Sequence, residues 1–149
     1  GGKTMNSLEL AKRTLEEGGY TCVVAGGGEV IFTSRERGVK PLVEYCRRFG
    51  KEPPREAALA DKVIGRAAAL LAVLAGITEL YAKVISVSAR AELEKAGIPA
   101  GCEIKAEAIR NRAGDGLSPM ERLSQGVTAP EEMLRRAEEF LAEMARKAP

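Results

Sequence analysis

The sequence predicts an α/β protein with three layers, in which a mixed β-sheet lies between helices. Three segments carry this prediction: residues 61–76 are typical of one buried helix, residues 80–109 of a strand–helix–strand unit, and residues 20–34 of a β-hairpin. A strand–helix–strand unit makes parallel strands with a right-handed crossover, whereas a hairpin makes antiparallel strands. A single sheet that contains both must therefore be mixed.

Composition sets the class of protein. The 149 residues fit one domain, 1–149, with residues 1–5 expected to be a tag remnant or a frayed terminus. Apolar residues make up 45% and charged residues 30%, as in ordinary globular proteins. The net charge is +2, from 23 basic and 21 acidic residues, with no basic stripe, so we expect no nucleic-acid partner. No signal peptide or membrane span is visible, which predicts a cytoplasmic protein without a membrane partner.

Histidine is absent from the chain, and its three cysteines are far apart. The first fact excludes histidine-based catalytic triads, HExxH sites and histidine-ligated metals. Cys22, Cys46 and Cys102 are typical of small buried hydrophobes rather than of a disulfide framework or a zinc ribbon. We therefore expect no metal and no cofactor.

The N-terminal third predicts a helix, a hairpin and a second helix. Asn6 can cap a helix over residues 7–17. Two β-rich runs, 20–25 and 29–34, are joined by three glycines that permit the positive φ angles of a tight turn. After a charged connection, Pro41 suits the first turn of a helix that ends near Phe49.

The segment 61–76 predicts the central helix. Asp61 can cap its start, and Gly76 can end it in the left-handed conformation. Residues 67–75 are apolar on every face, which is typical of a helix buried on most sides. Polarity is confined to the first turn, in Asp61, Lys62 and Arg66. Two interpretations stay open: the turn belongs to a site, or Gly65 permits close packing and the charges are solvated.

The following segments predict the strand–helix–strand unit. A strand over 79–87 precedes a helix over 89–96, which Ser86 or Ser88 can cap. Residues 102–109 alternate between apolar and charged side chains, so we expect a strand near a sheet edge with one buried face.

A loop from Asn111 to Glu121 leads into the C-terminal helices. Ser118 and Glu121 form a capping box, and Thr128 with Glu131 predicts another at the start of the last helix. The loop is either a flexible turn before a helix, or a cleft wall in which Asn111, Arg112 and Asp115 face an anion or a nucleobase edge.

Four motifs together resemble a known family: GEVIFTSRERGVKPL, ADKVIGRAAALLAV, YAKVIS and IRNRAGDGLSPME. Over residues 10–141 the chain resembles a small prokaryotic family of unknown function with a cytidine-deaminase-like fold. The resemblance implies that the start of the central helix faces an active-site cleft. Zinc deaminases carry H-x-E or C-x-E there and P-C-x-x-C at the next helix. This chain has Gly65-Arg66-Ala67 and Ser86-Val87-Ser88-Ala89 in those places, so zinc-dependent deamination is not expected.

Three functional hypotheses follow. The first is a module that binds a nucleotide-like or phosphorylated small molecule without zinc chemistry, through Lys40, Asp61, Lys62, Arg66, Lys83, Asn111, Arg112, Asp115 and Ser118. The second is a metal-free enzyme, with Asp61 or Asp115 as base and Lys62 or Lys83 as acid or electrophile. The third is a regulatory or interaction subunit. The sequence also leaves a homo-oligomer open.

The positions of these residues give a geometric expectation. Asp61, Lys62 and Arg66 should converge with Asn111, Arg112 and Asp115 in one cleft at the edge of the sheet. Replacing Arg66 and Arg112 by alanine should then weaken the binding of an anionic nucleotide and leave stability within about 0.5 kcal/mol, because exposed arginines contribute little to folding.

Overall fold

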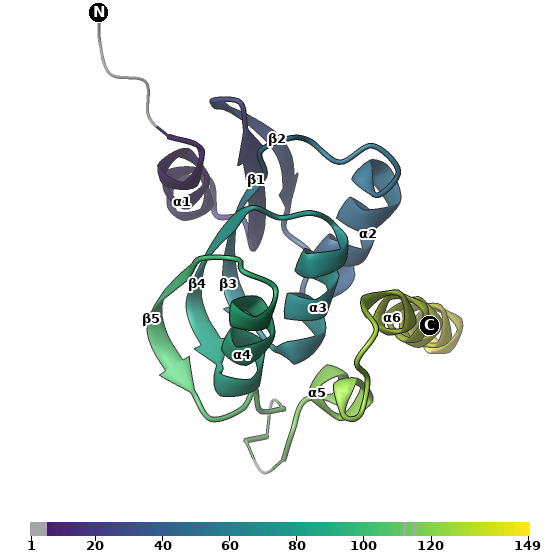
Figure 1. Ribbon diagram of the computed structural model, residues 1–149. Coiled ribbons are helices and arrows are strands. Elements are labelled where there is room, and N and C mark those ends of the chain that lie inside the picture. The colour runs from purple at the N-terminus through teal and green to yellow at the C-terminus, as the bar shows by residue number, and fades with distance from the viewer. Residues whose placement is uncertain (1–5, 112, 115) are drawn as a thin grey trace, which may run out of the picture.

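The structure, a computed structural model, describes residues 6–111, 113–114 and 116–149. Five strands form one sheet in the order β2-β1-β3-β4-β5 (Figure 1). The strands are β1 Cys22–Gly26, β2 Glu29–Ser34, β3 Ala58–Ile64, β4 Glu79–Ser86 and β5 Ala100–Ala106. The helices are α1 Ser7–Gly18, α2 Lys40–Phe49, α3 Arg66–Leu74, α4 Val87–Lys95, α5 Pro119–Ser124 and α6 Pro130–Lys147.

The sheet is mixed, as the sequence predicts. Strand β1 pairs antiparallel with both β2 and β3, whereas β3, β4 and β5 run parallel to one another. The hairpin turn uses Gly27 and Gly28 at φ 62° and 83°, angles that side chains other than glycine rarely adopt.

Helices cover both faces of the sheet, which confirms the three-layer prediction. Helix α1 packs against β1 and β3 on one face, and α2, α3 and α4 cover the other (Figure 1). Helix α6 packs outside α2 and α3. Ala67–Ala72 of α3 are all buried within the larger apolar core, so α3 lies between the sheet and α6 as its composition predicts.

The predicted start of the central helix is wrong. Residues Ala58–Ile64 form strand β3, and the helix begins only at Arg66, with Gly65 as its N-cap residue. Asp61 is therefore a strand residue, opposite Cys22 of β1, and not a helix cap. The end of the helix is confirmed, because Gly76 adopts φ 75° just after it.

Several smaller boundaries also differ. Strand β5 starts at Ala100 and ends at Ala106, so it does not reach residue 109. Helix α6 starts at Pro130 after Ala129, which makes no side-chain cap, so the predicted box of Thr128 and Glu131 does not form. Ser86 caps α4, and Asn6 caps α1 as predicted.

Candidate functional site

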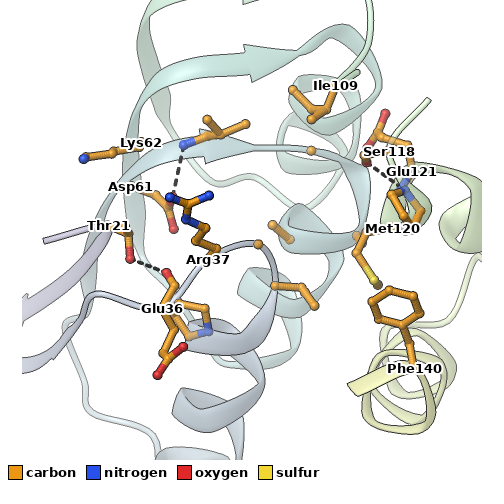
Figure 2. Close-up of a pocket in the computed structure, with 18 residues that line it drawn as sticks. Thr21, Glu36, Arg37, Asp61, Lys62, Ile109, Ser118, Met120, Glu121 and Phe140 are labelled. Atoms are coloured by element: carbon orange, nitrogen blue, oxygen red, sulfur yellow. Dashed lines mark hydrogen bonds between the residues drawn. The ribbon is translucent and has the colours of Figure 1, made fainter. Parts of the chain in front are cut away.

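A cleft of about 640 Å³ opens at the C-terminal end of β3, between the starts of α2 and α3 and the pair α5 and α6 (Figure 2). This is the end of a parallel strand from which a helix departs, where α/β proteins commonly bind ligands. The polar lining residues are Thr21, Glu36, Arg37, Asp61, Lys62, Ser118 and Glu121.

Asp61 is the buried acid of this cleft. Only 7% of its surface is exposed, yet it contributes to the lining. Burial raises its pKa from 3.8 to about 7, because the charged form loses hydration, and three hydrogen bonds oppose the rise only in part. They come from the backbone N–H groups of Val63, at 3.1 Å, and Lys62, and from the thiol of Cys22. No described lysine or arginine forms an ion pair with this carboxylate.

Two exposed cations lie on the rim near Asp61. Lys62 is its neighbour on β3, and Arg37 comes from the connection between β2 and α2. In Figure 2 the Arg37 guanidinium lies beside Asp61, whereas the Lys62 side chain points away from it. The hydroxyl of Thr21 donates to the carbonyls of Ser34 and Glu36 and so holds that connection against the sheet.

The start of α2 completes this side of the cleft. Gly38, Val39 and Pro41 line it, and Val39 provides no side-chain cap to the first turn of the helix. The positive end of the α2 dipole is therefore not neutralised by a capping side chain. This dipole end, Arg37 and Lys62 are positive, whereas Glu36 and Asp61 place carboxyl groups on the same side of the cleft.

The opposite wall is apolar. Met120 and Phe140 lie on the side away from Asp61 in Figure 2, and Ile109 lies at a third side. Val63, Ala67, Ala68 and Pro119 add further carbon surface to the lining. The flat apolar part of a ligand would gain free energy by leaving water for such a wall.

The N-terminus of α3 already holds an internal anion. The carboxylate of Glu121, from α5, accepts the backbone N–H of Arg66 at 2.8 Å and is 7% exposed. Gly65 permits this approach, because a Cβ there would lie 2.5 Å from the Glu121 carboxylate oxygen and 3.1 Å from Ile109. Ser118 accepts the backbone N–H of Glu121, which is one half of the predicted capping box. The other half is absent, since Glu121 caps α3 instead.

The side chain of Arg66 is bound by other residues of the protein. Its guanidinium pairs with Glu92 of α4 at 3.2 Å and donates to the backbone carbonyls of Ser124 and Val127. The side chains of Arg66 and Glu92 are 17% and 14% exposed. These contacts join α3, α4 and the connection between α5 and α6, and Arg66 is not among the residues lining the cleft.

Of the nine residues that the sequence predicts for a site, some line the cleft and others lie elsewhere. Asp61, Lys62 and Ser118 line the cleft. Lys40 lies at the start of α2 and pairs with Glu36, Lys83 lies on β4, and Asn111 caps a turn by accepting the N–H of Gly114. None of these last three lines the cleft. Arg112 and Asp115 lie outside the described residues.

Comparison with known proteins gives the family. The family described as a domain of unknown function, DUF1893, matches residues 10–141. The chain belongs to the DUF1893 family. The crystal structure of a DUF1893 family protein, TM1506 from Thermotoga maritima, matches with a TM-score of 0.82 at 27% identity, covering 93% of this chain and 92% of that one. The resemblance noted from the sequence motifs is thereby confirmed.

A weaker likeness concerns a deaminase. A diaminohydroxyphosphoribosylaminopyrimidine deaminase/5-amino-6-(5-phosphoribosylamino)uracil reductase from Thermotoga maritima matches with a TM-score of 0.44 at 17% identity. The match covers 96% of this chain and 40% of that one. Among curated proteins, none matches this DUF1893 chain.

The described residues contain neither a metal-binding cluster nor a membrane-spanning helix. Within them, no three histidine, cysteine, aspartate or glutamate residues are placed to hold a metal ion. No helix in the described ranges is long and apolar enough to cross a membrane. The expectation that this DUF1893 protein binds no zinc stays a prediction.

Sequence reasoning missed much of the lining. Arg37 lies in the segment predicted as a charged connection, and Glu121 is predicted as the partner of Ser118. Phe140 is one of only three phenylalanines, and this large side chain on the amphipathic helix α6 was the available indication. Each of these depends on a contact between segments that are far apart in sequence.

Proposed function

We propose that this DUF1893 protein binds a nucleotide-like small molecule, with a ring against the apolar wall and an anionic group at the rim. The observation that carries the proposal is the combination in one cleft of a buried carboxyl group, an apolar wall and two exposed cations, Arg37 and Lys62. A ligand complementary to it has a planar body, at least one hydrogen-bond donor and a negative charge.

The carboxylate of Asp61 is suited to accept a hydrogen bond from a donor on such a ring. A carboxylate has about four acceptor sites, and the three internal hydrogen bonds of Asp61 leave one for a donor on the ligand. Amino groups and ring N–H groups of nucleobases supply this donor. Because the pKa of Asp61 is about 7, the group can meet either a donor or an acceptor near neutral pH.

The anionic group fits the side of the cleft that carries Arg37 and the start of α2. Arg37 offers a planar set of donors, Lys62 adds a point charge, and the start of α2 adds its dipole. The N-terminus of α3 is a poorer choice, since Glu121 already occupies it. The proposal thus places the phosphate at α2, not at the helix that the sequence suggests.

Isothermal titration calorimetry with the four common nucleoside 5′-monophosphates and the corresponding nucleosides tests the proposal. We expect at least one monophosphate to bind at least about tenfold more tightly than its nucleoside, since a charge-assisted contact contributes about 1.5–3 kcal/mol. The Arg37→Ala/Lys62→Ala variant should lose that difference. Lys83→Ala is the matched control, because Lys83 is a cation of β4 that does not line the cleft.

Two results would contradict this function. One is that none of the eight compounds binds wild-type protein at millimolar concentration while native mass spectrometry finds no ligand retained from the host. The other is that the Arg37→Ala/Lys62→Ala variant binds the monophosphate as tightly as wild type does.

A metal-free enzyme is the second candidate, and Asp61 is the observation that favours it. A carboxyl group with a pKa near 7 is suited to general acid–base catalysis at neutral pH. Lys62 is the neighbouring candidate acid, whereas Lys83 is outside the cleft lining and Asp115 outside the described residues. Incubating a bound nucleotide with the protein and following it by NMR separates the two functions. Turnover that is lost in Asp61→Asn supports the enzyme, and an unchanged ligand supports the binding module.

A further inference from the structure

The outer edge of strand β5 is open. Strand β5 is the last strand of the sheet, and among the described strands only β4 pairs with it. Figure 1 shows β5 at the margin of the molecule, with α4 on its inner side. An open strand edge presents unpaired backbone N–H and C=O groups to another chain.

The backbone geometry identifies which groups face outward. Leu80 of β4 donates its N–H to the carbonyl of Pro99, so the backbone groups of residue 99 point toward β4. Because these directions alternate along a strand, residues 101, 103 and 105 also face β4. The N–H and C=O groups of Ala100, Cys102, Ile104 and Ala106 then face away from the sheet.

The side chains of β5 also alternate. Glu103 accepts a hydrogen bond from the Tyr81 hydroxyl at 2.7 Å, and Tyr81 packs with α1, so Glu103 lies on the α1 face of the sheet. Lys105, two residues on, lies on the same face. Ile104 is on the opposite face and is 57% exposed, the largest fraction among the exposed large hydrophobic residues described.

We propose that two copies of this chain pair antiparallel through β5 around a two-fold axis at Ile104. In this register Ile104 lies opposite Ile104 of the second copy, and the two exchange backbone hydrogen bonds. Glu103 then lies opposite Lys105 of the second copy, and Lys105 opposite Glu103, in the closely spaced non-hydrogen-bonded pairs. The proposal concerns an interface and uses no residue of the cleft lining.

Charge selects this arrangement over its alternatives. In a parallel pair in register, Glu103 would lie beside Glu103 and Lys105 beside Lys105, which is unfavourable. The antiparallel register makes both pairs attractive, and the two-fold axis relates one pair to the other. It also covers the exposed Ile104 side chain with its own copy.

The other edge of the sheet is less suited to pairing. Strand β2 has an irregularity where Phe32 pairs with Val24 and Val30 pairs with Ala25, so that Ile31 is an extra residue. A bulge of this kind twists an edge and protects it from further strands. Strand β5 pairs with β4 without such a shift over residues Ala100–Ala106.

Sedimentation velocity at low salt tests the interface through charge reversal. Wild type should be a dimer, and Glu103→Lys and Lys105→Glu alone should each raise the dimer Kd at least about tenfold, because each creates two like-charge pairs. The double variant should recover the wild-type Kd. An equimolar mixture of the two single variants should form a heterodimer, since every pair across it is again complementary.

Two controls isolate the pairing. Tyr81→Phe removes only the intramolecular hydrogen bond to Glu103 and should leave the dimer unchanged. Glu29→Lys makes the same reversal at an exposed position of β2 and should also leave it unchanged. Circular dichroism checks that each variant is folded. A monomeric wild type at 100 µM, or a dimer whose Kd the single reversals do not change, would overturn the proposal.

Discussion

The pH dependence of stability gives the sharpest test of the environment of Asp61. Burial raises its pKa from 3.8 to about 7, so the folded chain binds this proton more tightly than the unfolded chain does. The difference corresponds to about 4 kcal/mol at about 1.4 kcal/mol for each pH unit. This contribution is fully present below about pH 4, declines between about pH 4 and pH 7, and is lost above pH 7.

The perturbation is Asp61→Asn, which keeps the side-chain size and cannot ionise. Asparagine can still accept the N–H of Val63, which lies 3.1 Å from the Asp61 carboxylate oxygen. The free energy of unfolding of the variant, minus that of wild type, should therefore increase as pH rises from 4 to 8. We expect the increase to reach about 2–4 kcal/mol, because relaxation around a buried charge reduces the full value.

Urea unfolding at pH 4, 5, 6, 7 and 8, followed by circular dichroism, measures this difference. All other titrating groups affect both proteins alike and cancel in the subtraction. Glu131→Gln, a neutral substitution of an exposed carboxylate in the first turn of α6, should give a difference that varies with pH by less than about 0.5 kcal/mol. A pH-independent difference for Asp61→Asn would refute the raised pKa.

Further predictions concern the start of α3 and the metal content. Glu121→Ala should lower the free energy of unfolding by about 2–3 kcal/mol in urea titrations, because it leaves the Arg66 N–H and the helix dipole without their acceptor, and Glu121→Gln should cost less than half of that. Gly65→Ala should cost about 1–3 kcal/mol by displacing the Glu121 carboxylate, and its effect should not add to that of Glu121→Ala. Arg66→Ala should lower stability by more than about 1.5 kcal/mol, since its charged contacts are largely buried, and a loss below about 0.5 kcal/mol would restore its interpretation as an exposed ligand-binding residue. Elemental analysis of chelator-free protein should find well below one zinc per chain, and a stoichiometric ion would refute the zinc prediction.

The larger part of the fold was predictable because its signals are local. Three adjacent glycines between β-rich runs predicted the hairpin, and alternation in residues 102–106 predicted the strand at the sheet edge. Asn6 predicted the start of α1 by its type and place. Each of these features depends on side chains within a few residues of one another.

The boundary between β3 and α3 was not predictable in the same way. Strand β3 lies in the centre of the sheet, so Leu59 and Ala60 pack into opposite faces, and the segment shows no alternation. Its apolar stretch, residues 57–60, is too short to distinguish a buried strand from a buried helix. Its alanines favour a helix, whereas pairing with β1 on one side and β4 on the other decides for a strand.

The candidate site depends on contacts between distant segments for a similar reason. Sequence reasoning assigned Arg66 to a ligand and Glu121 to its own helix, because both residues lie at helix starts. In the structure, Arg66 bonds to Glu92 and to backbone carbonyls, and Glu121 crosses to α3. Helix-start rules identify which groups need a partner, but only the fold decides whether a ligand or another side chain supplies it.

Asp61 differs from Glu121 and Arg66 in a way that bears on function. Those two residues have partners that offset the removal of their charges from water, so they stabilise the fold. The carboxyl group of Asp61 has hydrogen bonds and no described ion pair, and ionisation lowers the stability of the fold at neutral pH. A residue that lowers the stability of the fold while it lines a cleft is expected to serve in binding or catalysis. If Asp61→Asn is more stable at pH 8 and also binds the nucleoside monophosphate as wild type does, this argument for a role of Asp61 in the site fails.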